Sequence, residues 1–142
     1  MPEVNAGSLV LVVEDNDDDF EATERALRQA DDLQPEVRRC RDGLQAWQVL
    51  NRTSEPNPSL ILLDLNMPGL DGRNLLKRLK ENENLCHIPV VVMTTSDAEE
   101  DVVGCYRSGA NSFVQKPLDW KSFVQTIRGL REYWFELSKL PG

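Results

Sequence analysis

Short, uninterrupted apolar runs separated by amphipathic stretches constrain the fold of this chain more than any other feature. Runs of four to six aliphatic residues without polar alternation are typical of strands buried on both faces, as in a parallel sheet. Four such runs occur, at residues 9–13, 60–63, 89–93 and, more weakly, 112–115. Residues 37–40 are a poorer candidate, which would suit the edge of a sheet.

Amphipathic stretches alternate with these runs. Helical spacing of apolar residues is found over residues 20–30, 44–50, 70–79 and 120–137, and a helix around 102–106 is predicted to end at Ser108-Gly109. A strand followed by a helix, five times over, predicts an α/β fold with an open, doubly wound parallel sheet and helices on both faces. The 142 residues suit one domain, and we assign residues 8–132 to it and residues 133–142 to a C-terminal helix extension.

The acidic composition argues against several classes of function. The chain has 16 Lys and Arg against 24 Asp and Glu, a net charge of −8, which disfavours binding to nucleic acid or to an anionic membrane. The longest apolar run, residues 9–13, is far shorter than the roughly twenty residues that a membrane span needs. The first residues lack the basic flank and apolar stretch of a secretory signal.

The number and spacing of the cysteines indicate the cellular compartment of the protein. Cys40, Cys86 and Cys105 are odd in number, and their spacing matches no zinc or redox motif. We therefore expect buried thiols in a reducing cytosol, and hence a cytoplasmic protein. Because His87 is the single histidine, neither a hydrolytic triad nor a structural zinc site is supported.

Polar residues follow the predicted strands at the points where ligands bind in open α/β sheets. Glu14 and Asp15 follow the first strand, Asp64 ends the third, Thr94 ends the fourth and Lys116 follows the fifth. Three neighbouring carboxylates repel one another, and a divalent cation such as Mg²⁺ removes that conflict. The ammonium and the hydroxyl suit a phosphoryl group, and a carboxylate beside a metal can form an acyl phosphate.

Two charged runs have simpler interpretations. The acidic residues 17–19 would be stabilised by the dipole of a helix that begins there, so we interpret them as first-turn residues rather than as metal ligands. The basic cluster of Arg38, Arg39 and Arg41 is interpreted as a solvated strand edge.

Four motifs resemble the marker motifs of response-regulator receiver domains. They lie at residues 12–16, 62–72, 92–95 and 108–117, in the order and spacing of that family. The resemblance implies a flavodoxin-like (βα)5 fold whose five-stranded parallel sheet has the order 2-1-3-4-5. It also implies a signalling protein that accepts a phosphoryl group from a sensor histidine kinase.

The resemblance assigns roles to the acidic residues. Asp64 matches the phospho-accepting aspartate. Asp15 matches the residue that binds Mg²⁺ directly, and Glu14 matches the one that acts through water. Asn66 matches the position whose backbone carbonyl completes the metal site together with Asp64.

The resemblance also implies a switch. Thr94 and Lys116 match the hydroxyl and the lysine that contact the phosphoryl group, and Phe113 matches an aromatic residue that changes rotamer. Phosphate on Asp64 would attract the Thr94 hydroxyl and open space for Phe113. The bond between Lys116 and Pro117 matches a cis peptide bond of the family, although most X-Pro bonds are trans.

A narrower resemblance concerns the kinase partner. Residues 64–68, 71–75 and 88–96 and the tail around residues 133–141 look like the stand-alone regulators of cyanobacterial and bacterial phytochromes. The expected partner is therefore a sensor histidine kinase, and the narrower resemblance implies a phytochrome. The signal would pass on by conformational change or by phosphorelay.

We expect this switch to catalyse only its own phosphotransfer and dephosphorylation, and not to be an enzyme otherwise. Two other functions are alternatives to it. An aspartate-nucleophile phosphatase uses similar groups, but it needs a second aspartate two residues after the nucleophile, where this chain has Asn66. Its nucleophile also ends the first strand, whereas Asp64 would end the third. An unphosphorylated, receiver-like interaction module is the other alternative.

The last predicted helix has a longer apolar stripe than one domain needs. At about 100° per residue, the stripe comprises Trp120, Phe123, Ile127, Leu130, Trp134 and Leu137, of which we expect the first four to cover the sheet. The remainder, widened by two further aromatic residues, predicts a homodimer interface of Tyr133, Trp134, Phe135 and Leu137. The alternative is that the tail folds back on its own domain.

Overall fold

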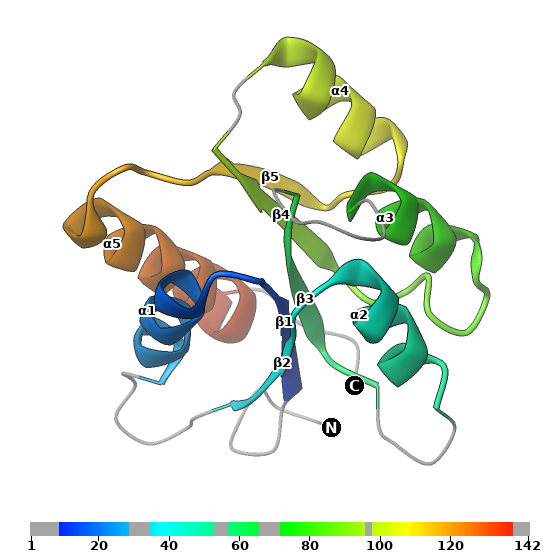
Figure 1. The fold of residues 1–142 in the computed structure, drawn as a ribbon, viewed down its shortest axis with the longest axis horizontal. Helices are drawn as coiled ribbons and strands as arrows, with labels where there is room; N and C mark the ends of the chain where they lie inside the picture. Colours follow the sequence, from blue (N-terminus) through cyan, green and yellow to red (C-terminus); the bar gives the residue numbers. More distant parts are fainter. Residues whose placement is uncertain (1–8, 29–34, 53–56, 66–71, 96–97, 138–142) are drawn as a thin grey trace.

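The computed structural model describes residues 9–28, 35–52, 57–65, 72–95 and 98–137, which form a single α/β unit (Figure 1). The strands are β1 (Leu9–Val13), β2 (Glu36–Cys40), β3 (Leu60–Asp64), β4 (Val90–Thr94) and β5 (Ser112–Gln115). The helices are α1 (Asp17–Leu27), α2 (Gly43–Leu50), α3 (Gly72–Glu81), α4 (Glu99–Arg107) and α5 (Trp120–Arg131), which continues into the π-helix η1 (Glu132–Leu137). None of these helices is long and apolar enough to cross a membrane.

The sheet has the predicted parallel pairing and the order β2-β1-β3-β4-β5. All residues of β1, β3 and β4 are buried, which explains their continuous apolar runs, whereas β2 and β5 are the partly exposed edges. The structure extends β3 by one residue beyond its apolar run, to Asp64, and shifts β4 by one residue, to Val90–Thr94. These polar groups are therefore the last residues of buried strands, held by the sheet itself.

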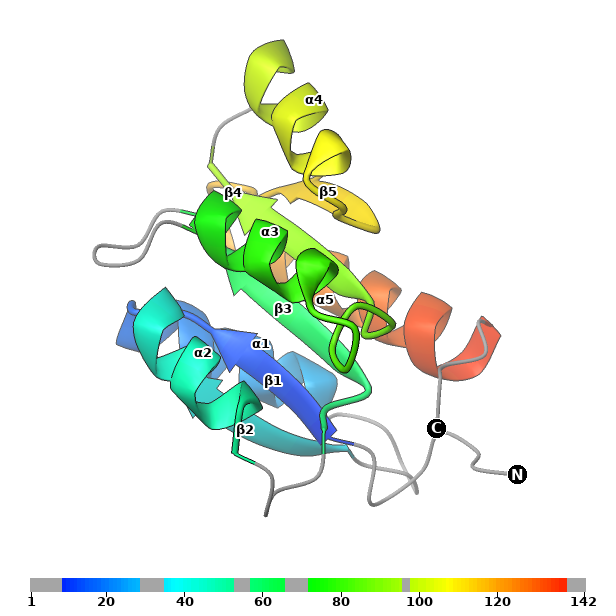
Figure 2. The same ribbon diagram turned by 90° about the vertical axis from the view of Figure 1, so that its right-hand side faces the viewer.

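Helices cover both faces of the sheet, as predicted (Figure 2). One apolar core lies under α2, α3 and α4 and includes Ala46, Leu75 and Cys105. The other lies under α1 and α5 and includes Leu27 and Ile127. The two cores hold the central strands rigid from both sides, so the polar ends of these strands have fixed positions.

Helix ends are set by local side chains. The side chain of Asn16 accepts a hydrogen bond from the Asp19 amide, so α1 begins at Asp17, three residues before the predicted start. At the other end of the sheet, Gly109 follows α4 with a φ of 107°, and a Cβ there would clash with the side chain of Lys80. The predicted end of α4 at this glycine is confirmed.

The C-terminal segment differs from the prediction. Trp134 is only 9% exposed and packs in the core under α1 and α5, so it does not provide the exposed apolar surface that the predicted interface requires. The end of α5 is tied to α1 because the Arg131 Nε donates a hydrogen bond to the Leu27 carbonyl at 2.9 Å, which leaves Trp134 beside its own core. Tyr133 remains 52% exposed, with its ring edge-on to Trp134. The side chains of Phe135 and Leu137 lie outside the described part of the chain.

Two further expectations are corrected. Trp120, which was expected to cover the sheet, is instead 53% exposed at the first residue of α5. Cys40 and Cys105 are buried as predicted, but Cys86 is exposed because it lies in the turn after α3.

The burial of Trp134 predicts a large difference between neighbouring aromatic residues. Trp134→Ala should lower the free energy of unfolding by about 3 kcal/mol, because it leaves a cavity in the core. Tyr133→Ala should change it by less than about 1 kcal/mol, because that ring is half exposed. Urea denaturation of the two variants beside the wild type measures both. Equal losses would mean that Trp134 is not part of the core.

Candidate functional site

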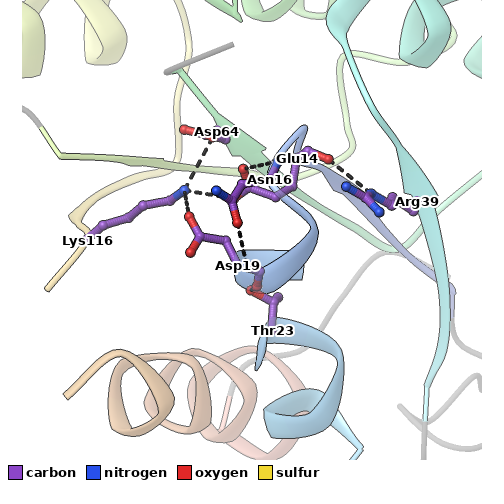
Figure 3. Close-up of polar contacts among 7 residues, drawn as sticks. All are labelled: Glu14, Asn16, Asp19, Thr23, Arg39, Asp64 and Lys116. Atoms are coloured by element: carbon purple, nitrogen blue, oxygen red, sulfur yellow. Dashed lines mark hydrogen bonds and ion pairs between the residues drawn. The ribbon is translucent and has the colours of Figure 1, made fainter. Parts of the chain in front are cut away.

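The polar residues predicted at the strand ends do meet at one edge of the sheet (Figure 3). Since the strands are parallel, the residues that follow β1 and end β3 lie side by side, at the point where the strand order reverses direction. Lys116 follows β5 and extends its side chain across the end of β4 to reach them. Its amide donates a hydrogen bond of 2.7 Å to the Thr94 carbonyl, which fixes its backbone against β4.

The Lys116 ammonium is the centre of the site. It is 2.7 Å from Glu14 Oε1, 3.0 Å from Asp19 Oδ2 and 3.3 Å from Asp64 Oδ2. Lys116, Glu14 and Asp64 are all buried, with side chains between 4% and 8% exposed. Hydrogen bonds to a buried ammonium are strong, so this cluster joins residues that lie 102 positions apart in the sequence.

Carboxylates outnumber the ammonium in this cluster. Glu14, Asp15 and Asp64 each offer an oxygen, and these oxygens all lie within 4.8 Å of one another. Burial and, second, a hydrogen bond with Asp64 raise the pKa of Glu14 to about 8, although Lys116 acts in the opposite direction. The site therefore favours extra positive charge beyond that of Lys116.

The same excess of negative charge acts on the lysine. Burial alone would lower the pKa of Lys116, but its hydrogen bond to Glu14 and the charges of Asp64 and Glu14 raise it above its ordinary value. Lys116 is therefore a permanent cation at this edge. A donor set of three hard carboxylate oxygens fits a divalent cation such as Mg²⁺, which prefers such ligands.

The loop before α1 and the first turn of this helix hold the carboxylates of Glu14 and Asp19 in place. The Asn16 amide donates a hydrogen bond to Glu14 Oε2 at 3.4 Å, and the Asn16 side chain accepts one from the Asp19 amide. The Thr23 hydroxyl donates to the Asp19 carbonyl. These hydrogen bonds fix the conformation of the loop between β1 and α1. The carboxylates of Glu14 and Asp19 are both directed toward Lys116 (Figure 3).

Comparison with known proteins identifies this arrangement. The sequence pattern of the response regulator receiver domain matches residues 10–128. The chain belongs to the response regulator receiver family. Response regulator Rcp1 of Synechocystis sp. is 37% identical over 143 residues, covering 98% of this chain and 97% of the relative. The protein is therefore a signalling protein of this family.

Solved receiver structures have the same fold. The phosphorylated cyanobacterial phytochrome response regulator RcpA is 34% identical, with a TM-score of 0.91 over 96% of this chain and 100% of that one. The Mn²⁺-bound form of response regulator Rcp1 is 36% identical, with a TM-score of 0.90 over 95% of this chain and 99% of that one. A divalent cation in that relative agrees with the acidic cluster of this receiver domain.

Other residues expected at the receiver site have mixed outcomes. Thr94 is buried at the end of β4, as expected. Phe113 is half-buried in β5, and its amide donates a hydrogen bond to the Tyr106 hydroxyl of α4 at 3.2 Å. Asn66 lies outside the described residues. The peptide bond between Lys116 and Pro117 is not cis, in line with the ordinary preference of X-Pro bonds.

Sequence reasoning missed two residues of the receiver site. Asp19 was interpreted only as a first-turn acid, yet it binds Lys116; the signal was that α1 begins so soon after Glu14 and Asp15. Arg39 was interpreted as part of a solvated edge, yet its Nε donates to the Glu14 carbonyl and its side chain is 16% exposed. No sequence pattern distinguishes Arg39 from its neighbours Arg38 and Arg41.

The excess of carboxylates predicts opposite effects for two substitutions. In the presence of a chelator, Asp64→Asn should raise the free energy of unfolding by about 1 kcal/mol, because it relieves repulsion at nearly constant volume. Lys116→Met should lower it by about 3 kcal/mol, because it leaves buried carboxylates without their cation. Urea denaturation in EDTA tests both. A destabilised Asp64→Asn variant would contradict the electrostatic account.

Proposed function

We propose that Asp64 accepts a phosphoryl group from a sensor histidine kinase and that the resulting change of shape relays the signal. The observation that supports this most strongly is the position of Asp64. It ends the central strand β3, is buried among carboxylates, and has one oxygen 3.3 Å from the Lys116 ammonium. A carboxylate in these surroundings can act as a nucleophile toward phosphorus.

The proposed transfer needs an ionised Asp64. One of its oxygens forms a bond to phosphorus while the bond between phosphorus and the kinase histidine nitrogen breaks, and the electron pair of that bond stays on the imidazole. Lys116 then pairs with a phosphoryl oxygen in place of Asp64, since the new oxygens carry more negative charge. Thr94, from the adjacent strand end, donates its hydroxyl to another.

Glu14, Asp15 and Asp64 would hold the divalent cation, for which we propose Mg²⁺, with Asp15 as a direct ligand and Glu14 acting through water. The carbonyl of Asn66, outside the described residues, is proposed as a further ligand. When bound, the cation neutralises the carboxylates and the phosphoryl oxygens. The same residues would support the slow loss of the phosphoryl group to water, the only turnover we assign to the chain.

For the kinase, we propose a phytochrome. The support is the likeness to RcpA, a cyanobacterial phytochrome response regulator. A cytoplasmic location is proposed as well, because Cys40 and Cys105 are buried thiols that form no disulfide in the described part of the chain. Nucleic acid is not proposed as a partner, given the net charge of −8.

The acceptor is tested by labelling. Acetyl phosphate with Mg²⁺ should place an acid-stable, base-labile phosphoryl group on the wild type and none on Asp64→Asn, because only Asp64 has this position. Excess EDTA should prevent labelling of the wild type, and Asp15→Ala should lose more labelling than Glu14→Ala. Phosphate-affinity electrophoresis measures the labelled fraction. Undiminished labelling of Asp64→Asn would refute the proposal.

For the switch, we propose that Thr94 and Phe113 carry the change to the surface. Thr94 would move toward the phosphoryl group and leave space for Phe113 to turn inward. The hydrogen bond from the Phe113 amide to Tyr106 supports this route, since it connects the switch residue directly to α4. The surface around α4 and β5 would then exist in two states.

Hydrogen exchange checks the switch. Phosphorylation should change amide exchange in α4 and β5 of the wild type, whereas Thr94→Ala should accept phosphate and lack that change, because the hydroxyl that senses phosphate is gone. Thr95→Ala, which removes the neighbouring hydroxyl, is the matched control and should respond like the wild type. A Thr94→Ala variant with the full exchange response would show that another residue carries the signal.

A homodimer through the C-terminal region is retained as a proposal in a narrower form. Trp134 is part of its own core, so of the four predicted interface residues Tyr133 is the one with a described, exposed side chain. Sedimentation velocity of the wild type and Tyr133→Ala, with and without phosphate, tests this. We expect a wild-type dimer that Tyr133→Ala weakens, and a wild-type monomer in both states would refute it.

A further inference from the structure

Arg39 contacts the acidic loop from the side opposite Lys116 (Figure 3). It lies near the end of the edge strand β2, where its backbone is in register with Val12 of β1. Its Nε donates a hydrogen bond of 3.1 Å to the carbonyl oxygen of Glu14. This carbonyl belongs to the peptide group that joins Glu14 to Asp15, the two residues of the acidic pair.

Two more contacts fix the guanidinium group. Its Nη1 is 2.8 Å from Asp17 Oδ1, and its central carbon lies 4.8 Å from the centre of the Phe20 ring. Both partners belong to α1, so Arg39 connects β2 to the loop after β1 and to the helix that follows it. A planar guanidinium held at three points has one orientation, which a flexible ammonium would not have.

The peptide groups on both sides of Glu14 are therefore bound to β2. The Glu14 amide donates to the Cys40 carbonyl at 2.9 Å, and the Glu14 carbonyl accepts from Arg39. With both peptide planes fixed, the directions in which the Glu14 and Asp15 side chains leave the backbone are fixed too. Backbone pairing accounts for the first bond, whereas the second depends on one side chain.

We propose that Arg39 is a positioning residue for the divalent cation: by holding the Glu14–Asp15 peptide, it keeps the two carboxylates in the arrangement that binds the metal. This inference rests on the proposed function, because it concerns the same cation site. Arg39 itself does not touch the cation. The burial of its Nη2, which has no partner among the described residues, indicates that the side chain is not arranged for stability alone.

Electrostatics and positioning predict opposite signs for the loss of Arg39. A cation close to an acidic site repels Mg²⁺, so removing its charge alone should tighten metal binding. If Arg39 positions the ligands, removing it should weaken binding instead. Arg41 is a matched control, because it also contacts Asp17 Oδ1, at 2.9 Å, but its side chain is 60% exposed and pairs with Asp17 rather than with the Glu14 carbonyl.

The experiment is a calorimetric titration of Mg²⁺ into the full chain. Arg39→Met keeps an unbranched side chain over Phe20 and removes every donor; we expect its Kd to rise about tenfold. Arg41→Met should bind Mg²⁺ as the wild type does or slightly more tightly. An Arg39→Met variant that binds as tightly as the wild type, or more tightly, would overturn the proposal.

Phosphorylation by acetyl phosphate supplies a second measurement. Arg39→Met should be slow at limiting Mg²⁺ and close to the wild-type rate at saturating Mg²⁺, because the defect is in binding the cation. A defect of equal size at saturation would overturn the positioning role. If Arg39→Met does not fold, as judged by circular dichroism, Arg39→Lys replaces it. It keeps the charge but not the planar fork, so we again expect weaker binding, and unchanged binding refutes the proposal.

The outcome for the wild type separates this inference from the proposed function. Asp15→Ala serves as the variant without a site. If the wild type binds no more Mg²⁺ than Asp15→Ala does, the proposed cation site fails, and the role of Arg39 fails with it. If the wild type binds more Mg²⁺ than Asp15→Ala does, and Arg39→Met binds it as tightly as the wild type, the cation site stands and only the inference about Arg39 is wrong.

Discussion

The ion cluster around Lys116 is the interaction on which the site depends. One ammonium contacts carboxylates from the loop after β1, from α1 and from the end of β3. These contacts require that β5 lie two places from β3 and that every strand run in the same direction. A change in strand order or register would separate the charges, so the topology of the sheet and the chemistry of the site are one constraint.

This cluster has more negative charge than its own lysine can balance. Buried carboxylates in excess disfavour the folded state, and the high pKa of Glu14 is one expression of that cost. The three fully buried strands and the two apolar cores supply the stability that offsets it. The rigid sheet thus keeps together groups that would otherwise move apart, and a cation or a phosphoryl group changes the balance between them.

The sequence was informative where a residue follows a buried strand. The apolar runs predicted all five strands within one residue, and the residues after them predicted Glu14, Asp64, Thr94 and Lys116 as neighbours, since parallel strands end at one edge. Arg39 could not be predicted, because a strand-edge base is common without any such contact. Asp19 was missed because the dipole of the helix alone accounts for an acid in its first turn. Trp134 was misplaced for a different reason: helical periodicity gives the face of a residue but not how far the core beneath that face extends.

The hydrogen bond between Tyr106 and β5 has a consequence for self-association. β5 is an edge strand, and an edge strand with unpaired amides can add a strand from another molecule, which is the first step of aggregation. The Phe113 amide, one of the donors that such a strand would need, already donates its hydrogen bond to the Tyr106 hydroxyl. The side chain of Tyr106 therefore leaves this edge with one fewer unpaired donor, and a movement of α4 that breaks the bond would expose that donor to a neighbouring molecule.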